Sequence, residues 1–255
     1  MVTPRLLKSV VTISVSIFLM PVTSWVDGLP NHTFASAALA SVPEQLKTAL
    51  NYAPPRRGTP RRTQGTGSRG CSQSQPVALE LIVPNDHTAQ TVSGHPTFFW
   101  HVSDIPNQPV EFSLVEAGVA QPIFVKQIQP QKPGLVRMEM PKNLPELSPD
   151  KEYRWSVSLV CNANRRSNDT FAQSWVKRVS GTAALEQQLA TARSDRDRAL
   201  VYAKAGLWYD ALNAISTAQA ANPTDSSIRE DFLTLLDQAG LTKVALQERQ
   251  QVAKH

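Results

Sequence analysis

The side chains of this sequence that come nearest to a chemical site are three histidines and two aspartates in one short stretch. They are Asp86, His87, His95, His101 and Asp104. Imidazole and carboxylate groups bind metal ions, so a fold that gathered these five at one end of a domain would form a metal site. Their spacing matches no motif with a known mechanism. We therefore expect exposed histidines without a function, and no metal.

Signatures of catalysis are missing from the sequence. It contains no nucleophile elbow, no phosphate-binding glycine loop and no helix with paired metal-binding histidines. Four glutamates are scattered along expected strands and should be solvated: Glu111, Glu116, Glu139 and Glu152. We predict a binding protein with no catalytic residues and no cofactor. An enzyme of unknown type is a remote alternative.

Two stretches of the sequence echo each other 34 residues apart. They are AKAGLWYDAL, from Ala203 to Leu212, and DQAGLTKVAL, from Asp237 to Leu246. Without a gap, Ala205, Gly206, Leu207, Ala211 and Leu212 return as Ala239, Gly240, Leu241, Ala245 and Leu246. This period is typical of tetratricopeptide repeats, helix pairs that bind peptides and other proteins. The echo therefore indicates contact with a partner.

The last quarter of the chain resembles the tetratricopeptide family over about 60 residues. The expected tyrosine, glycine, alanines and proline fall on Tyr202, Gly206, Ala211, Ala218 and Pro223, whereas Asp195, Arg198 and Ala199 depart from the pattern. The resemblance implies a groove lined by the first helix of each pair. Here Arg193, Arg196, Leu200 and Lys204 would line it and suit an acidic or C-terminal carboxylate peptide. The alternative is a solvated face on which Arg193 pairs with Asp197 one turn away.

A basic segment precedes the expected folded part. Residues 41–75 carry six basic residues and one acidic residue, so the net charge of +5 is concentrated there. Residues 41–53 are expected to form a short helix, and residues 54–75 a disordered arm, because Pro, Gly, Ser, Thr and Arg dominate them. Its arginines are Arg56, Arg57, Arg61, Arg62 and Arg69. The arm is either a binding site for anionic envelope polymers or lipids, or a solvated spacer; we expect no nucleic acid.

The N-terminal 40 residues predict export. Arg5 and Lys8 precede an apolar run from Val10 to Val22, which is long enough for a secretory signal and short for a membrane span. Small-residue cleavage sites follow at 35–37 and 38–40. The alternative is an uncleaved anchor, which would be the only membrane contact. In both cases the body of the protein would be periplasmic, in the cell envelope or extracellular.

Export gives meaning to the two cysteines, Cys71 and Cys161. Oxidising compartments favour disulfides, so we predict that these two pair. The alternative is two free, buried thiols.

Residues 76–180 are expected to form an immunoglobulin- or fibronectin-like β-sandwich. Seven short strands alternate with turn residues: Leu79–Val83, Pro96–Val102, Val110–Ala117, Ile123–Ile128, Leu135–Met140, Glu152–Cys161 and Phe171–Val179. We expect the Tyr153 hydroxyl to bond back to the preceding corner, and Trp100 and Trp155 to lie in the core.

Residues 181–255 are expected to be helical. One long helix should run from Ala183 to Gly206, followed by helices at 207–222, 226–240 and 241–254. Two repeats are fewer than an independent array usually needs. We therefore expect the helices to dock on the sandwich or on another subunit, with Trp208 and Trp175 at the junction. The fold class is then α+β with several domains.

From about Arg56 to Leu241 the chain also resembles a family found mainly in cyanobacteria, Domain of Unknown Function 928. The resemblance rests on RRGTPRRTQGTGSRGC, PTFFWHV, YRWSVSLVC, SWVKRV and GLWYDAL. It implies an exported protein without an assigned activity. Together these patterns predict a protein-interaction adaptor of the cell envelope, with anionic-polymer binding through the arm as the alternative.

Overall fold

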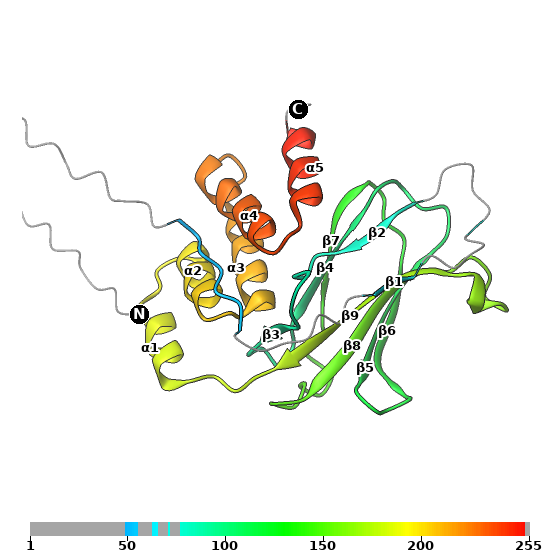
Figure 1. The fold of residues 1–255 in the computed structure, drawn as a ribbon, viewed down its shortest axis with the longest axis horizontal. Coiled ribbons are helices and arrows are strands. Elements are labelled where there is room, and N and C mark those ends of the chain that lie inside the picture. Colours follow the sequence, from blue (N-terminus) through cyan, green and yellow to red (C-terminus); the bar gives the residue numbers. More distant parts are fainter. Residues whose placement is uncertain (1–48, 56–62, 66–70, 72–76, 253–255) are drawn as a thin grey trace, which may run out of the picture. The chain divides into compact units, whose positions relative to one another are not determined.

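The computed structural model describes residues 49–55, 63–65, 71 and 77–252. The predicted signal and most of the basic arm lie outside these residues. Lys47 to His255 form one compact unit, in which strands come first and helices follow (Figure 1).

The strands of the described residues form two sheets. The larger has the order β1 (Thr63–Gly65), β9 (Thr170–Arg178), β8 (Glu152–Leu159), β5 (Val110–Glu116) and β6 (Pro122–Ile128), with β3 (Ala89–Thr91) pairing parallel to β9. The smaller has the order β2 (Leu79–Leu81), β4 (Thr97–Val102) and β7 (Gly134–Glu139). All seven predicted strands are present. Sequence analysis missed β1 and β3, which are three residues each and lack apolar alternation.

The two sheets pack face to face through aromatic side chains. The ring centroid of Phe98 on β4 lies 5.0 Å from those of Phe112 on β5 and Trp155 on β8. Trp100 and Trp155 are fully buried, which confirms that both are core residues. The predicted corner is also confirmed, because the Tyr153 hydroxyl accepts a hydrogen bond from the Ser148 N–H at 2.7 Å.

Five helices follow the sheets: α1 (Ala183–Thr191), α2 (Asp195–Lys204), α3 (Trp208–Ala221), α4 (Ser226–Gln238) and α5 (Thr242–Val252). The prediction of a single helix from Ala183 to Gly206 is wrong, because α1 ends at Thr191 and a second helix, α2, begins at Asp195. Ser194 caps α2 by accepting the Asp197 N–H at 3.0 Å, and the Asp197 carboxylate accepts the Arg193 N–H at 3.1 Å. These side-chain bonds to the backbone replace helical ones and start a new helix.

The 34-residue echo corresponds to two turns of the same geometry. Gly206 after α2 and Gly240 after α4 both have φ near +76°. In each turn the next residue donates back across the helix end, Leu207 to the Tyr202 carbonyl and Leu241 to the Leu236 carbonyl. This is a Schellman motif, which favours glycine because its left-handed position strains residues with a Cβ.

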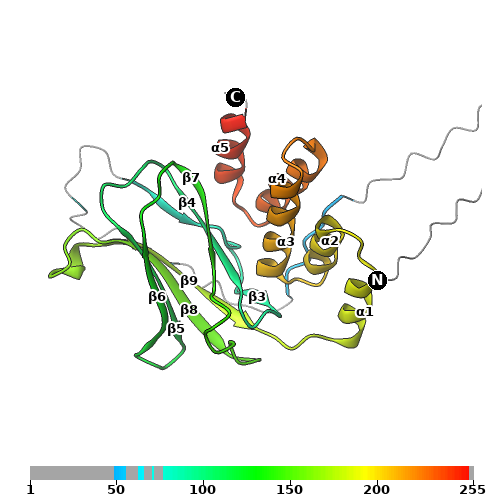
Figure 2. The same ribbon diagram turned by 180° about the vertical axis from the view of Figure 1, so that it is seen from behind.

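Helix α3 packs against β3 and β4, and α5 lies beside the smaller sheet (Figures 1 and 2). Every residue of β4 is buried, so both of its faces are covered, and α3 contacts β3 and β4. At the start of α3, the Trp208 indole donates to the Ile82 carbonyl at 2.9 Å. The docking prediction is therefore confirmed, with Trp208 at the junction. Trp175 contributes its backbone carbonyl to the junction, where this oxygen accepts a hydrogen bond from the Tyr209 hydroxyl.

A segment that we name the strap, residues 49–55, crosses the ends of α2 and α4. The predicted helix over 41–53 is absent from its described part, 49–53, and the rest lies outside the described residues. Both polar atoms of the Gln238 side-chain amide bind the strap. Its Oε1 accepts the Tyr52 N–H at 2.7 Å, and its Nε2 donates to the Leu50 carbonyl at 3.1 Å. Leu50 is 1% exposed and Tyr52 6%. Leu50 and Tyr52 therefore belong to the hydrophobic core, and this part of the chain is not a free linker.

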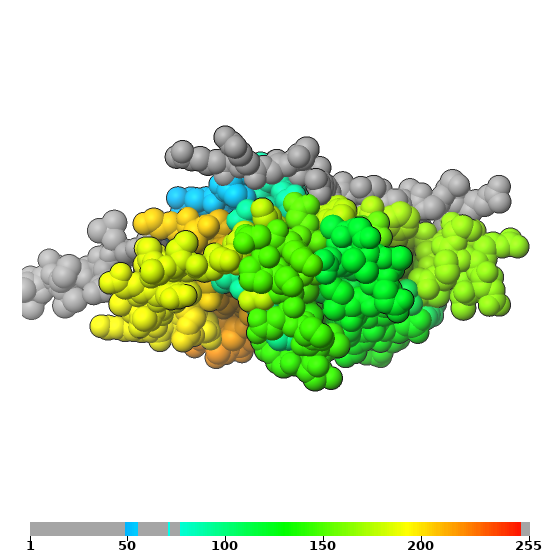
Figure 3. Space-filling model, turned by 90° about the horizontal axis from the view of Figure 1, so that it is seen from below, coloured from blue at the N-terminus to red at the C-terminus, as the bar shows by residue number. Residues whose placement is uncertain are grey.

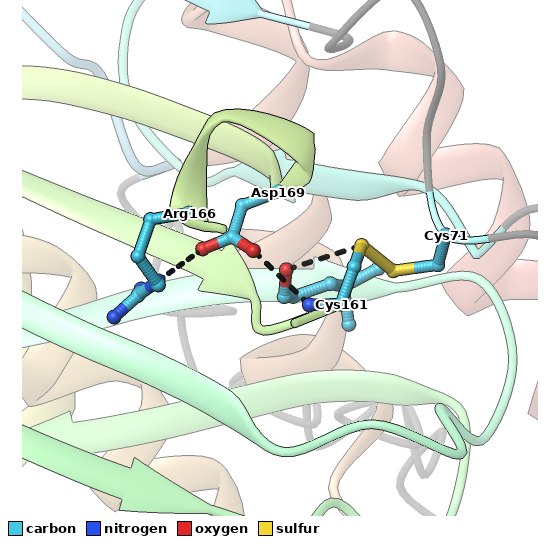
Figure 4. The surroundings of a disulfide bond; sticks show 5 residues. Cys71, Cys161, Arg166 and Asp169 are labelled. Carbon is cyan, nitrogen blue, oxygen red and sulfur yellow. Dashed lines mark hydrogen bonds and ion pairs between the residues drawn. A yellow bond between two sulfur atoms is a disulfide. The ribbon is translucent and has the colours of Figure 1, made fainter. Parts of the chain in front are cut away.

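The predicted disulfide between Cys71 and Cys161 is present and spans 90 residues of sequence (Figure 4). Next to it, the Cys161 N–H donates to Asp169 at 3.0 Å, and Arg166 pairs with the same carboxylate. Together with the β1–β9 pairing and the strap, this bond attaches the N-terminal region to the folded unit at three places.

Candidate functional site

A cleft of about 440 Å³ lies between α2, α3 and the loop that joins β3 to β4. We call it the junction cleft. Its polar lining includes Ser93, His95, Asp195, Arg198, Tyr202 and Asn213. In Figure 3 the yellow residues of the α1–α2 region lie directly beside the green strand residues on one face of the unit. The cleft exists because the helices pack on the sheets, so it belongs to neither part alone.

One wall of the junction cleft is a face of α2. Asp195, Arg198 and Tyr202 follow one another at spacings of three and four residues, which places them on one side of a helix. Arg198 forms an ion pair with Asp195. Their side chains are 46% and 37% exposed, so both remain accessible to a ligand. This wall therefore offers a cation, a carboxylate and a phenol side by side.

The opposite wall is fixed by Asp210 in the first turn of α3. Its carboxylate accepts the Val92 N–H at 3.1 Å and a hydrogen bond from the Thr91 side chain. Burial raises the pKa of Asp210 to about 6, and the bonds from Thr91, Val92 and Ser93 limit that rise. Asp210 thus holds the β3–β4 loop against the helical part.

The loop itself is held by further polar contacts. His95 Nε2 donates to the Leu144 carbonyl at 2.8 Å, and Arg178 Nε donates to the Val92 carbonyl at 3.4 Å. The Ser93 N–H donates to the Thr91 hydroxyl at 3.0 Å. These bonds give the loop wall a defined shape.

Two tyrosines that line the junction cleft have raised pKa values. Tyr209 lies between the sheets, where its hydroxyl accepts the Trp155 indole N–H at 2.8 Å, and burial raises its pKa. Burial and the nearby Asp210 carboxylate also raise the pKa of Tyr202. Both phenols therefore stay protonated at neutral pH and can donate hydrogen bonds.

The predicted peptide groove is not gathered as one open basic face. Arg196 is committed to Asp231, with Nε 2.6 Å from Oδ2, and Leu200 packs against the core. Arg193 and Lys204 are exposed, and Arg193 precedes α2. The contact between Arg193 and Asp197 does form, but through the arginine backbone N–H. The neighbouring face of α2, which lines the junction cleft, is therefore the better candidate for a binding surface.

The predicted anion-binding arm lies outside the described residues, with all five of its arginines: Arg56, Arg57, Arg61, Arg62 and Arg69. Its binding stays a prediction from the sequence.

The expectation of exposed histidines is wrong, because all three make or face internal contacts. His87 is 7% exposed; its Nδ1 donates to Asp86 at 2.7 Å and its Nε2 accepts the Tyr52 hydroxyl at 2.6 Å. His95 holds the loop, as described above, and His101 is 5% exposed. Within the described part of the chain, no three residues of metal-binding type come together. His87 and His95 anchor separate segments.

Comparison with known proteins identifies the family. A family profile, Domain of Unknown Function (DUF928), matches residues 64–249. The chain belongs to the DUF928 family. The DUF928 match begins in β1 and ends in α5, so it contains every residue of the junction cleft. No curated protein matches the chain. None of the helices in the described DUF928 region is long and apolar enough to cross a membrane.

The sequence did hold a signal for the junction cleft. Asp195 and Arg198 occupy positions where the tetratricopeptide pattern expects other residues, and both line the cleft. Departures from a structural pattern are expected at functional positions. The loop residues gave no such signal, because nothing local in the sequence places them beside α3.

Proposed function

We propose that this protein is a non-enzymatic adaptor of the cell envelope that captures a segment of a partner protein in the junction cleft. The observation that carries the proposal is the cleft itself, a polar concavity of about 440 Å³ with walls from the helices and from the β3–β4 loop. Concave sites with a few fixed polar groups are the usual places for ligand binding.

The chemistry of the walls supports binding over catalysis. Asp210 is the buried carboxylate of the cleft, and its oxygens accept hydrogen bonds from the loop that it holds. The Tyr209 hydroxyl is likewise shared between Trp155 and Trp175. A general base needs an oxygen within reach of a substrate proton. These groups shape the site, whereas the accessible Arg198 and the side-chain NH2 of Asn213, whose oxygen accepts a bond from Arg137, are the groups for contact with a ligand.

The finer fold classes and the export of the protein are part of the proposal. We infer an immunoglobulin-like arrangement of the two sheets, supported by the Tyr153 corner, and tetratricopeptide-like helix pairs, supported by the matching turns at Gly206 and Gly240. The disulfide between Cys71 and Cys161 supports an oxidising location outside the cytoplasm.

A site-specific crosslinking experiment tests the adaptor proposal. A photo-crosslinking amino acid replaces Asn213 in the cleft or, as a control, Asn164 on the exposed loop beside the disulfide. Each protein is illuminated in an envelope extract, and the crosslinked partner is identified. We expect one partner to be captured from position 213 and not from position 164. Equal capture from both positions would contradict the proposal.

Charge-reversing variants then locate the binding face. We expect Arg198→Glu with Tyr202→Ala to weaken binding of the identified partner by about 30-fold, the effect of losing a dominant contact. Arg193→Glu is the matched control, because Arg193 is exposed on the same part of the chain and does not line the cleft. If Arg193→Glu abolishes binding and the double variant does not, the partner uses the groove expected from the sequence.

A further inference from the structure

A buried histidine and a half-buried glutamate face each other across the contact between α5 and the smaller sheet. His101 lies on β4 and Glu248 on α5, with His101 Nε2 4.0 Å from Glu248 Oε1. Among the described residues neither atom has a hydrogen-bond partner, and both are shielded from solvent. Leaving a buried polar group unpaired is unfavourable, because the group loses its hydrogen bonds to water and gains none in return. His101 Nε2 and Glu248 Oε1 are therefore placed to form a hydrogen bond that is absent at their present separation.

Two described carboxylates lie near His101: Glu80 acts on its charge, and Glu248 has an unpaired oxygen facing its Nε2. Glu80 sits opposite His101 on β2 and favours the protonated imidazole, whereas Lys243 on α5 opposes it. On β7 the neighbour of His101 is the apolar Leu135, and Lys132, in the segment before β7, favours the ionised form of Glu248. The two unpaired atoms are 4.0 Å apart, so an approach of about 1 Å would bring them within hydrogen-bond distance.

We propose that His101 and Glu248 form an acid-responsive latch that ties the C-terminal helix α5 to the sheet. Proton uptake by His101 makes its Nε2–H a charged donor to the Glu248 carboxylate, and charge-assisted hydrogen bonds are roughly twice as strong as neutral ones. The proton comes from solvent, and no covalent bond changes. The latch acts on α5 alone and does not depend on the junction cleft.

The pH range of the latch follows from burial. Burial lowers the pKa of His101 and raises that of Glu248, because each charge alone is poorly solvated at this contact. A charged pair requires His101 protonated and Glu248 ionised, and burial of either charge alone opposes this, so the charged latch forms only where the contact stabilises both charges together. At higher pH His101 is neutral and the charged latch is released.

The consequence lies in the attachment of α5. Val244 and Ala245 anchor its first turn in the core, and Glu248 is one turn further along. The latch therefore controls how firmly the second half of α5 is held. Acid therefore tightens the attachment of α5 itself.

A titration of the imidazole protons by NMR tests the latch in the full chain. The protein has five histidines, and His101→Asn assigns the signal of His101. In Glu248→Gln we expect the pKa of His101 to fall by about one unit, a tenfold loss of coupling. Glu186→Gln, on α1, is the control and should leave it unchanged. An unchanged His101 pKa in Glu248→Gln overturns the latch.

Hydrogen exchange in the unaltered protein gives a second test that needs no variant. After correction for intrinsic exchange, amides of α5 should exchange about tenfold more slowly at pH 5.5 than at pH 7.5, while amides of α3 should not show this difference. Equal protection of α5 at both pH values overturns the proposal.

Discussion

Replacing the buried carboxylate of Asp210 should change how the stability of the protein depends on pH. In the folded state its pKa rises from 3.8 to about 6, because burial disfavours the charge. The difference of about two units corresponds to about 3 kcal/mol, at 1.36 kcal/mol per unit. A folded-state pKa above the unfolded value means that the folded protein binds the proton more tightly. The resulting stability is fully present below pH 3.8 and is lost as pH rises through 6.

The assay is denaturant unfolding at several pH values between 4 and 7, without reductant and followed by tryptophan fluorescence. We expect the unfolding free energy of the wild type, relative to that of Asp210→Asn, to fall by about 2 kcal/mol over this range, since the remainder of the total is lost below pH 4. Subtracting the two curves removes the contribution of groups that titrate alike in both proteins. Asp195→Asn, at the exposed mouth of the cleft, is the control and should follow the wild type. Parallel curves for wild type and Asp210→Asn would refute the buried state of this carboxylate.

Three further predictions concern the attachment of the N-terminal region and are all measured by denaturant unfolding. Gln238→Ala removes both amide bonds to the strap and should cost about 2 kcal/mol. Gly206→Ala should cost more than Gly118→Ala: both positions have positive φ, but a Cβ at Gly206 would lie 2.7 Å from the strap carbonyl of residue 53, whereas at Gly118 it meets open space. Replacing Cys71 and Cys161 by serine should cost about 4–5 kcal/mol, from loss of a 90-residue loop closure. Equal costs for the two glycines, or a negligible effect of the other changes, would contradict the contacts described.

The strands and the repeat turns were predictable because local patterns determine them. The alternation from Tyr153 to Leu159 identifies one buried face of β8, and the glycines at 206 and 240 mark the left-handed turns. The three consecutive aromatic residues from Phe98 to Trp100 in β4 also indicate a strand that is covered on both faces, as the structure has it. The break before α2 was readable as well, from Ser194 followed three residues later by Asp197.

The junction cleft and the strap were not predictable because they depend on contacts between distant parts of the sequence. Val92 and Asp210 are 118 residues apart, and Tyr52 and Gln238 are 186 residues apart. No local pattern of hydrophobicity or turn residues encodes such pairs. The histidines show the same limit, since polar spacing alone did not reveal that His87 binds a buried tyrosine.

The measurement that tests the central claim most directly is the affinity of the partner captured from position 213 for the wild type and for the Arg198→Glu, Tyr202→Ala variant. Both proteins are first shown to share the same circular dichroism and disulfide content. The account predicts a loss of about 30-fold in affinity for the variant and none for Arg193→Glu. Equal affinity of wild type and double variant would contradict the junction cleft as the binding site.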